Sequence, residues 1–426
     1  MTEWSQELGF TYFSSPEFFL GKTIKAWMPV LRKLGASVVV LPGNFFRAIP
    51  EDVFLCAKDN QLTPVVHFAS ELPLARKFNE VAFLLDVYAK WGVNEVILGN
   101  KPNMKHSWPN AGWHYESIVD HFIDRFVPLA THAVRLGITP VSPPLHPGGD
   151  YWDTAFMELF LAGLNRRQLA EILEHLILSS FGYTFNKPLD WGRGGPEQWA
   201  VSKPYQAKEG EQDQIGFHHF EWMQAIGQRA TGQNYQAIIL DAGNPGIQFS
   251  QINPGKVYED IRQIMQAYKD AVGKGSDDSA GEITFTENTR FCSFSLDTIN
   301  EIMVKPFEPV HLLRFFETKD HGKPAPSEGH NRSKPIKHYL LLPVHGSGIS
   351  NAILNKVRPI IKACQPTIGF SIEEAVMAER VSVYPDAKAF SDAAISQLRS
   401  SGCVVEILPE SGIEIATYLQ NKTFGN

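Results

Sequence analysis

Two apolar runs of the sequence end in residues that can carry chemistry. The first is followed by Asn100 and Lys101, within Leu98-Gly-Asn-Lys-Pro-Asn103, and the second ends in Asp241, within Ile238-Ile-Leu-Asp-Ala-Gly243. An aspartate can act as a nucleophile or as an acid, whereas a lysine donates a proton only when burial lowers its pKa well below about 10. If the two groups meet in a partly buried site, we expect a neutralising ion pair between Lys101 and Asp241, since buried charges are tolerated when paired.

Aromatic residues gather in the segments that follow other apolar runs. Rings of this kind can stack on the apolar faces of sugars, or can pack within the protein. We therefore treat as candidate substrate-binding residues Asn100, Trp108, Trp113, Trp152, Tyr183 and Trp191.

The elements that position these residues alternate between short runs rich in Val, Ile, Leu and Phe and longer amphipathic stretches. This alternation is typical of repeated strand-helix units. The predicted strands are 9–13, 37–42, 64–68, 95–99, 139–142, 177–183, 237–241 and 291–296. The predicted helices are 23–34, 78–91, 116–136, 154–175, 217–229 and 258–272, and Gly35, Gly92 and Gly137 stand where helix C-caps belong.

Eight such units without a Gly-x-Gly-x-x-Gly turn favour a closed (β/α)8 TIM barrel over an open dinucleotide-binding sheet. We assign residues 1–317 to the barrel. Residues 318–336 are rich in charged residues, Pro, Gly and Ser, which is typical of a linker. Residues 337–426 alternate strands and helices again, including helices at 349–364 and 372–380 and a strand at 381–384, and predict a small three-layer α/β, Rossmann-like domain.

In these strand-end residues the chain resembles the retaining (β/α)8 glycoside hydrolases of the cellulase-like superfamily. In that family strand four ends in Asn-Glu-Pro, with the Glu as acid/base, and strand seven ends in a Glu nucleophile. The resemblance implies that Asn100 binds a sugar hydroxyl, that Lys101 occupies the acid/base position and that Asp241 occupies the nucleophile position. The sequence also departs from the family at Phe181 on strand six, where a polar residue is common, and on strand eight, which lacks the frequent Trp.

These departures favour a catalytically degenerate glycoside-hydrolase-like barrel that binds a glycan or serves as a scaffold or docking module. Retaining hydrolysis needs two carboxyl groups about 5 to 5.5 Å apart, and Lys101 removes one of them. The alternative is an active O-glycosyl hydrolase, acting on a cell-wall or other polysaccharide, with Asp241 as nucleophile and an acid supplied from elsewhere. The expected partner of the chain is a glycan or a protein. A further hypothesis is that the chain belongs to a bacterial or phage-like assembly.

The composition of the chain argues against several classes of function. The 39 basic and 46 acidic residues give a net charge of −7, which argues against nucleic acid as the main partner. The four cysteines are far apart and form no Cys-x-x-Cys pair, so no metal site is expected, and no motif calls for a cofactor. We find neither a signal peptide pattern nor an apolar stretch long enough to span a membrane, which predicts a protein that is cytoplasmic or exported without a signal peptide.

Overall fold

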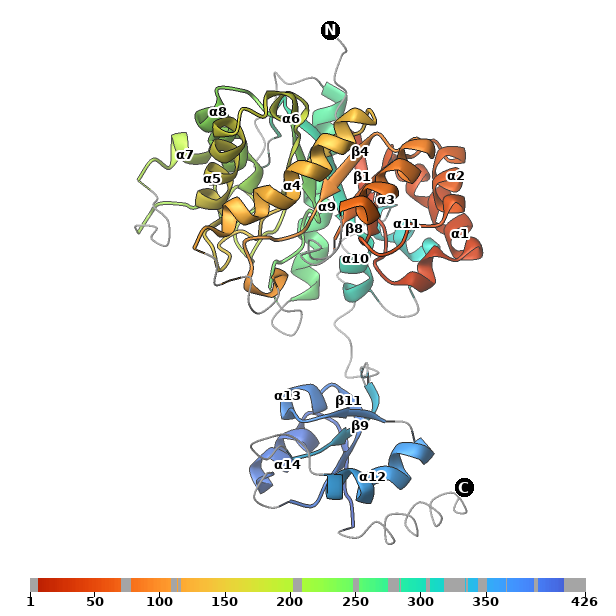
Figure 1. Cartoon of the computed structure of the whole chain (residues 1–426). Helices are drawn as coiled ribbons and strands as arrows, with labels where there is room; N and C mark the ends of the chain where they lie inside the picture. Colours follow the sequence, from red (N-terminus) through yellow and green to blue (C-terminus); the bar gives the residue numbers. More distant parts are fainter. Residues whose placement is uncertain are drawn as a thin grey trace. The chain divides into compact units, whose positions relative to one another are not determined.

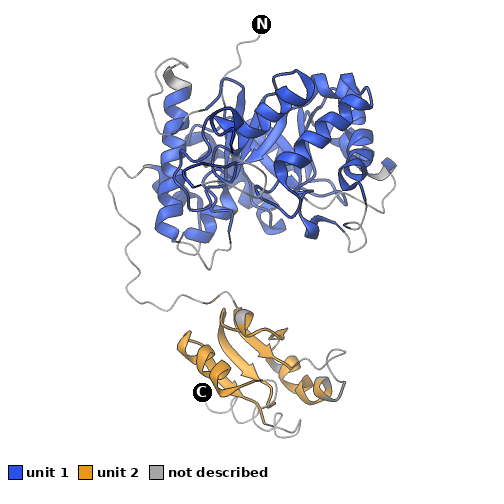
Figure 2. Cartoon of the chain, turned by 90° about the vertical axis from the view of Figure 1, so that its left-hand side faces the viewer, with its two compact units in different colours: residues 1–322 blue, residues 323–426 orange. Residues whose placement is uncertain are grey.

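A computed structural model divides the chain into two compact units, residues 1–322 and 323–426, which are coloured separately in Figure 2. The residues that the structure describes are 7–69, 78–108, 113, 116–201, 209–247, 253–274, 283, 285–303, 307–317, 334, 336–343, 351–364, 366–386 and 390–409. Nearly all of the expected linker lies outside these residues.

The first unit is built on eight parallel strands in the order β5-β4-β3-β2-β1-β8-β7-β6, as expected for a TIM barrel. The strands are β1 (Glu7–Thr11), β2 (Val38–Gly43), β3 (Thr63–Phe68), β4 (Glu95–Leu98), β5 (Thr139–Val141), β6 (Leu178–Phe181), β7 (Ala237–Leu240) and β8 (Thr289–Ser295). All eight coincide with predicted strands. Figure 1 shows them at the centre of the unit with helices packed outside.

The seam between β5 and β6 is closed by single bridges and serine side chains. Isolated parallel bridges join Val141 to Ile177 and Leu145 to Ser180. The Ser179 backbone N–H donates to Ser142 Oγ at 3.0 Å, and Ser179 Oγ donates to the Ser142 carbonyl at 2.5 Å. Two backbone hydrogen bonds also cross this seam, from the Ser142 N–H to the Ile177 carbonyl at 2.8 Å and from the Ile177 N–H to the Pro140 carbonyl at 3.2 Å, and the serine side chains add to them.

Alternate residues of each strand face the inside of the barrel or the helix layer. Inside lies a compact apolar core of Val38, Val40, Val65, Ile97, Val141, Ile177, Phe181, Tyr183, Ile238, Leu240 and Phe291. Residues between them, such as Val39, Val96 and Cys292, belong to the larger core between strands and helices. This alternation fixes which strand-end residues open onto the mouth of the barrel.

The helices of the first unit cover the outside of the strands. They are η1 (Pro16–Phe19), α1 (Gly21–Lys33), α2 (Glu51–Asp59), α3 (Phe78–Lys90), η2 (Lys105–Ser107), α4 (Ile118–Arg135), α5 (Asp153–Arg166), α6 (Ala170–His175), α7 (Gly195–Gln198), α8 (His219–Thr231), α9 (Pro254–Lys274), α10 (Leu296–Ile302) and α11 (Pro309–Glu317). Gly35, Gly92 and Gly137 have φ of 94°, 75° and 75°, as predicted for C-caps.

The prediction of a single helix over residues 154–175 is wrong. The chain leaves the helix after Arg166, and Gln168 adopts a left-handed φ of 56° before α6 begins at Ala170. The apolar residues on both sides of this break, among them Leu164 and Ile172, are buried, and they therefore continue the helical pattern across it. Periodicity alone could not locate the break.

The second unit is a small α/β domain with a four-stranded parallel sheet in the order β10-β9-β11-β12. Its elements are β9 (Ile336–Leu341), α12 (Asn351–Cys364), β10 (Thr367–Gly369), α13 (Ile372–Ala375), β11 (Ala378–Val383), α14 (Asp392–Ser400) and β12 (Val404–Ile407). Separate apolar cores form on the two faces of β9, one with Tyr339 and Leu398 and the other with Leu340 and Val357, which gives the expected three layers. The helix predicted to reach residue 380 instead ends at Ala375, and β11 begins at Ala378.

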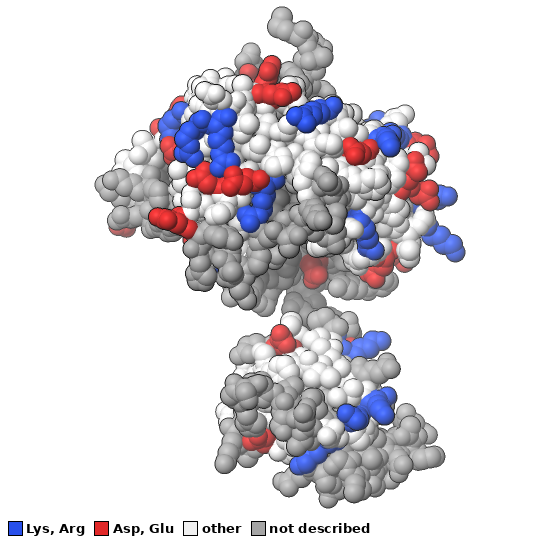
Figure 3. All heavy atoms as spheres, in the orientation of Figure 1, with Lys and Arg blue, Asp and Glu red and all other residues white. Residues whose placement is uncertain are grey.

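The surface of the first unit carries charges of both signs. Asp120 accepts from Arg166 at 2.9 Å and from Arg167 at 3.1 Å, and Arg167 also pairs with Asp124. On the face shown in Figure 3, basic and acidic side chains are interspersed. Among the described residues, no helix has the length and apolar character needed to cross a membrane.

Candidate active site at the barrel mouth

Lys101 and Asp241 both lie at the C-terminal end of the barrel, just beyond β4 and β7. They share an unusual backbone, since both are non-glycine residues in the left-handed region, with φ of 49° and 50°. On β7, Ile238 and Leu240 face inward, so continued alternation would turn Asp241 outward. The left-handed turn redirects its side chain, whose carboxylate interacts with Thr11 of β1, and this interaction lowers its pKa. Strained residues of this kind concentrate at functional sites.

The Lys101 ammonium lies against aromatic rings of β6 and of the segment that follows it. Its Nζ is 4.8 Å from the ring centroid of Phe181 and 5.2 Å from that of Tyr183. The two rings stack with centroids 4.4 Å apart and an interplanar angle of 17°. Phe181, which departs from the family pattern, thus forms part of an aromatic wall for the lysine, a cation–π arrangement.

The expected ion pair between Lys101 and Asp241 is not formed as a direct contact among the described residues. The two groups nevertheless act on each other. Burial lowers the pKa of Lys101, and Asp241 partly opposes this. Burial raises the pKa of Asp241 to about 6, which Lys101 lowers and a second carboxylate, Asp297, raises. The site therefore keeps its opposite charges apart and holds both pKa values closer to neutrality than usual.

Asp297 is a site residue that the sequence reasoning missed. It is the first turn residue of α10, directly after β8, and its Oδ2 accepts from the Ser14 backbone N–H at 2.9 Å. A carboxylate at a strand end is the signal that could have identified it. It lay outside the motif comparison because the family pattern places a tryptophan, and not an acid, near this position.

Asn100 and two histidines complete the polar lining near Lys101. Asn100 Nδ2 donates to the Ala69 carbonyl at 3.2 Å, whereas its buried Oδ1 has no hydrogen-bond partner among the residues that the structure describes. His67 Nε2 lies 3.1 Å from the Gly99 carbonyl, and burial, together with Lys101, lowers the pKa of His67 to about 4. Burial and Lys101 also lower the pKa of His146, whose ring lies 6.0 Å from that of Tyr183. Both histidines are neutral at pH 7, and the sequence reasoning assigned a role to neither.

The tryptophans are placed as packing residues more than as open platforms. Trp108 is 6% exposed, its Nε1 donates to the Pro102 carbonyl at 2.7 Å, and Arg125 lies 5.2 Å from its ring. Trp152 is also buried, and Trp113 is half-buried against the helix-layer core. Trp191 is half-buried, with Nε1 donating to Asp213 at 2.7 Å. Trp108 and Trp152 are buried, and Tyr183 is buried as well, with its ring beside the Lys101 ammonium.

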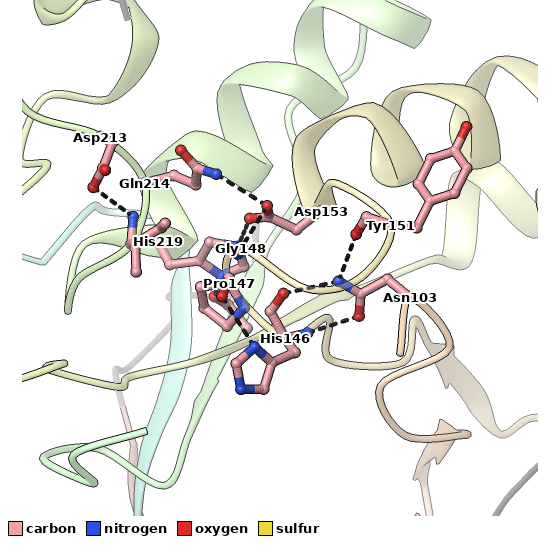
Figure 4. A network of polar contacts seen from close by, with 11 residues as sticks. Asn103, His146, Pro147, Gly148, Tyr151, Asp153, Asp213, Gln214 and His219 are labelled. Carbon is pink, nitrogen blue, oxygen red and sulfur yellow. Dashed lines mark hydrogen bonds and ion pairs between the residues drawn. The ribbon is translucent and has the colours of Figure 1, made fainter. Parts of the chain in front are cut away.

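A buried polar network holds the segment after β5 in place (Figure 4). Asn103 Nδ2 donates to the His146 and Tyr151 carbonyls, and Asn103 Oδ1 accepts from the His146 backbone N–H at 2.9 Å. Next to it, Asp153 accepts from the Gly148 N–H, from Gln214 Nε2 and from His219 Nε2, the last at 2.8 Å. These contacts fix His146 beside the aromatic wall.

The same network contains a serine, a histidine and an aspartate that contact one another in that order. Ser180 Oγ lies 2.5 Å from His219 Nδ1, and the other ring nitrogen of His219 contacts Asp153. All three side chains are buried, and Ser180 faces outward from β6 toward the helices because its neighbour Phe181 faces inward. The array therefore joins β6 to the first turns of α5 and α8 and has no access to the barrel mouth. Among the described residues, no group of three or more His, Cys, Asp and Glu side chains is arranged to hold a metal ion.

Known structures with a similar course of the chain include several glycoside hydrolases. A thermostable GH5 cellulase from an Icelandic hot spring isolate is 12% identical with a TM-score of 0.39, and the match covers 68% of this chain and 75% of the cellulase chain. The GH39 enzyme from Xanthomonas axonopodis pv. citri is 13% identical with a TM-score of 0.40, and the match covers 69% of this chain and 58% of the enzyme chain. An endo-beta-1,4-mannanase from Thermotoga petrophila is 9% identical with a TM-score of 0.36, and the match covers 69% of this chain and 68% of the mannanase chain. No protein-family model and no curated protein matches the sequence. The barrel assignment rests on the observed strand order.

Proposed function

We propose that the mouth of the barrel binds a glycan without cleaving it, as a catalytically degenerate glycoside-hydrolase-like site. The observation that carries this proposal is the buried, unpartnered Oδ1 of Asn100, next to Lys101 at the end of β4. A buried acceptor without a donor costs about 1 to 3 kcal/mol, and a ligand hydroxyl that donates to it, once neighbouring side chains move aside, removes that cost. The ammonium of Lys101, which lies against the buried ring of Tyr183, adds a hydrogen-bond donor beside it.

The chemistry of the pair supports binding over hydrolysis. Retaining hydrolysis needs one carboxyl to protonate the leaving oxygen and another to attack the anomeric carbon. The acid position holds Lys101, whose amine cannot serve as the carboxylate base of the second step. Asp241 is one methylene shorter than glutamate, which withdraws its oxygens by roughly 1 Å, a displacement that can cost about a hundredfold in rate.

A glycan array followed by titration calorimetry with the best binder tests the proposal. We expect Asn100→Ala to weaken binding about tenfold, which is the loss of one hydrogen bond to a buried partner. Asn234→Ala is the matched control, because Asn234 is exposed and precedes β7 at the opposite end of the barrel. Equal affinity of the Asn100→Ala and Asn234→Ala proteins, or no glycan bound by the wild type, would contradict the proposal and favour a scaffold or docking role toward a protein partner.

The second candidate function is an active O-glycosyl hydrolase that uses Asp241, and Asp297 is the observation that favours it. Asp297 supplies a second carboxylate close enough to raise the pKa of Asp241. Because Asp241 ionises near pH 6, its activity as a nucleophile would increase as the pH rises through that value. Aryl glycosides are the probe, since their leaving groups need little protonation. Turnover by the wild type that Asp241→Ala abolishes would establish this function, whereas the binding proposal expects no turnover.

A further inference from the structure

The second unit places a lysine and a cysteine in direct contact. Lys334 Nζ, just before β9, lies 2.7 Å from Sγ of Cys403, just before β12. The shortest N–H···O hydrogen bonds are about 2.7 Å long, and sulfur is a larger atom than oxygen. The contact is therefore shorter than an ordinary hydrogen bond to sulfur, yet longer than a direct bond between nitrogen and sulfur. A single oxygen atom bonded to both atoms spans a distance of this kind.

The surroundings of Cys403 turn its sulfur toward the lysine. Gly402, with a left-handed φ of 76°, follows α14, and Cys403 then enters the apolar core on this face of the sheet. Sγ also lies 3.6 Å from the carbonyl oxygens of Ala375 and Val376, either of which can accept the thiol hydrogen. With the hydrogen directed at these carbonyls, a lone pair of the sulfur faces Lys334 Nζ. Cys403 is 7% exposed and Lys334 is half-buried, so a reagent that modifies the pair must be small.

We propose that Lys334 and Cys403 form a redox-modification site, at which hydrogen peroxide joins Nζ to Sγ through one oxygen atom. Oxidation of a cysteine thiol begins with a sulfenic acid, which reacts further with a group held beside it. Groups held within about 3 to 3.5 Å of each other react far faster than the same groups in solution. The proposal goes beyond glycan binding, because it concerns the second unit and stands whether or not a glycan occupies the barrel mouth.

The reaction balances with two molecules of hydrogen peroxide. Cys403 Sγ attacks one oxygen of the first molecule, the O–O bond breaks, and a sulfenic acid and water form. The second peroxide displaces the sulfenic hydroxyl as water and leaves an S–O–O–H group. Lys334 Nζ, after one proton has passed to solvent, attacks the oxygen bonded to sulfur, the O–O bond breaks, and the departing hydroxide takes a proton from nitrogen as a third water. The thiol and the amine thereby lose four electrons to the peroxide and retain one of its oxygens.

The oxygen bridge cross-links the start of β9 to the start of β12. Residues 334 and 403 are 69 positions apart, and β9, β10 and β11 lie between them in the chain. A cross-link that closes a long loop restricts the unfolded chain and so stabilises the folded unit. Two molecules of a dithiol such as dithiothreitol supply the four electrons that return the thiol and the amine, with release of one water. The pair is thus a reversible device that stabilises the second unit under oxidising conditions.

Peptide mapping of the whole chain after treatment with hydrogen peroxide tests the proposal. We expect the peptides that contain Lys334 and Cys403 to be joined, with one oxygen more and two hydrogens fewer than the two free peptides together. Dithiothreitol should separate them. Cys364 is the internal control, since its thiol is exposed and should be oxidised without joining to a lysine. Oxidation of Cys364 without any joined peptide, or a joined peptide that lacks the added oxygen, would overturn the proposal.

Two matched lysine variants separate cross-linking from oxidation of the thiol alone. Lys334→Arg keeps the positive charge but removes the primary amine, whereas Lys337→Arg makes the same change at an exposed position of β9. Hydrogen exchange in β12, measured by mass spectrometry, reports on the second unit separately from the barrel. Peroxide should slow this exchange at least about tenfold in the wild type and in Lys337→Arg, and dithiothreitol should restore it.

In the Lys334→Arg protein, peroxide should leave the exchange of β12 unchanged. Equal slowing in the Lys334→Arg and Lys337→Arg proteins would show that oxidation of the thiol alone is responsible, and it would overturn the proposal. None of these measurements depends on the barrel mouth, so this proposal and that of glycan binding fail separately.

Discussion

Charged side chains are arranged in opposite ways at the two ends of the barrel. At the N-terminal end Arg290, near the start of β8, contacts Glu7 of β1 and Glu95 of β4, with Arg290 Nε 3.1 Å from Glu95 Oε1. These side chains are between 10% and 21% exposed, and they bridge three strands. Burial raises the pKa of Glu95, while Arg290 opposes this. The guanidinium thus contacts both carboxylates directly, and its charge opposes the rise in the pKa of Glu95.

At the C-terminal end the opposite charges stay apart. Lys101 contacts aromatic rings, Thr11 lowers the pKa of Asp241, and both residues occupy a left-handed backbone conformation. β4 joins the two ends, since it begins at the paired Glu95 and is followed closely by the unpaired Lys101. Stabilising groups collect at the N-terminal face of such barrels and reactive groups at the C-terminal face. The mouth thus combines separated charges with a left-handed backbone, as the proposed ligand site requires.

Replacing Arg290 with Met should give the largest loss of stability. The substitution leaves Glu7 and Glu95 partly buried without a cation, and removing one partner of a buried pair costs about 3 to 5 kcal/mol. Arg229→Met is the matched control, because Arg229 pairs with Glu158 at 3.2 Å with both side chains about half exposed. There the expected loss is below about 1 kcal/mol. Equal losses in urea unfolding would show that the N-terminal cluster is no more than a surface ion pair, and the comparison of the two ends would then fail.

The barrel could be predicted from the sequence because apolar runs and helix-ending glycines mark where each strand and helix lies along the chain. Each strand ends within a few residues of its predicted place, and so Lys101 and Asp241 were correctly located beyond β4 and β7. The second unit was likewise recognisable from alternating runs. Some ends of elements were misplaced, as at Ala375, where two residues separate a helix from a strand, and the break between α5 and α6 was missed.

The contacts within the site could not be predicted, because they depend on which way individual side chains turn. Strand alternation would have turned Asp241 away from the mouth, and its left-handed φ of 50° reverses this. Tryptophans in strand-end segments read equally well as platforms or as packing, and the buried Nε1 contact of Trp108 decides for packing. Asp297 and His67 belong to no spacing pattern, since the barrel brings them to the mouth from strands far apart in sequence.

An intermediate effect is expected from Asp241→Asn, and it depends on pH. The pKa of Asp241 is about 6 in the folded protein and about 3.8 unperturbed, so the folded state binds the proton more tightly. The stability that this proton gives is present below about pH 4 and is lost as the pH rises through 6. Asparagine does not ionise, so the variant should gain about 2 to 3 kcal/mol over the wild type between pH 4 and pH 7. A variant that is less stable than the wild type at pH 7 would mean that Asp241 and Lys101 pair as directly as Arg290 and its glutamates.

The smallest effect concerns the backbone of Lys101 and is isolated by two substitutions at one position. Lys101→Gly and Lys101→Ala both remove the amine and its contacts with Phe181 and Tyr183, so the loss of charge and packing is common to them. They differ in the left-handed φ of 49°, which costs a residue with a Cβ roughly 1 kcal/mol and glycine almost nothing. Glycine also gains more freedom in the unfolded chain, which offsets part of the difference. We therefore expect the glycine variant to be more stable than the alanine variant by about 0.5 to 1 kcal/mol in urea unfolding. Equal stability of the two variants would show that the turn at position 101 relaxes once the lysine side chain is gone. The strain at the mouth would then come from the contacts of the lysine and not from the backbone that follows β4.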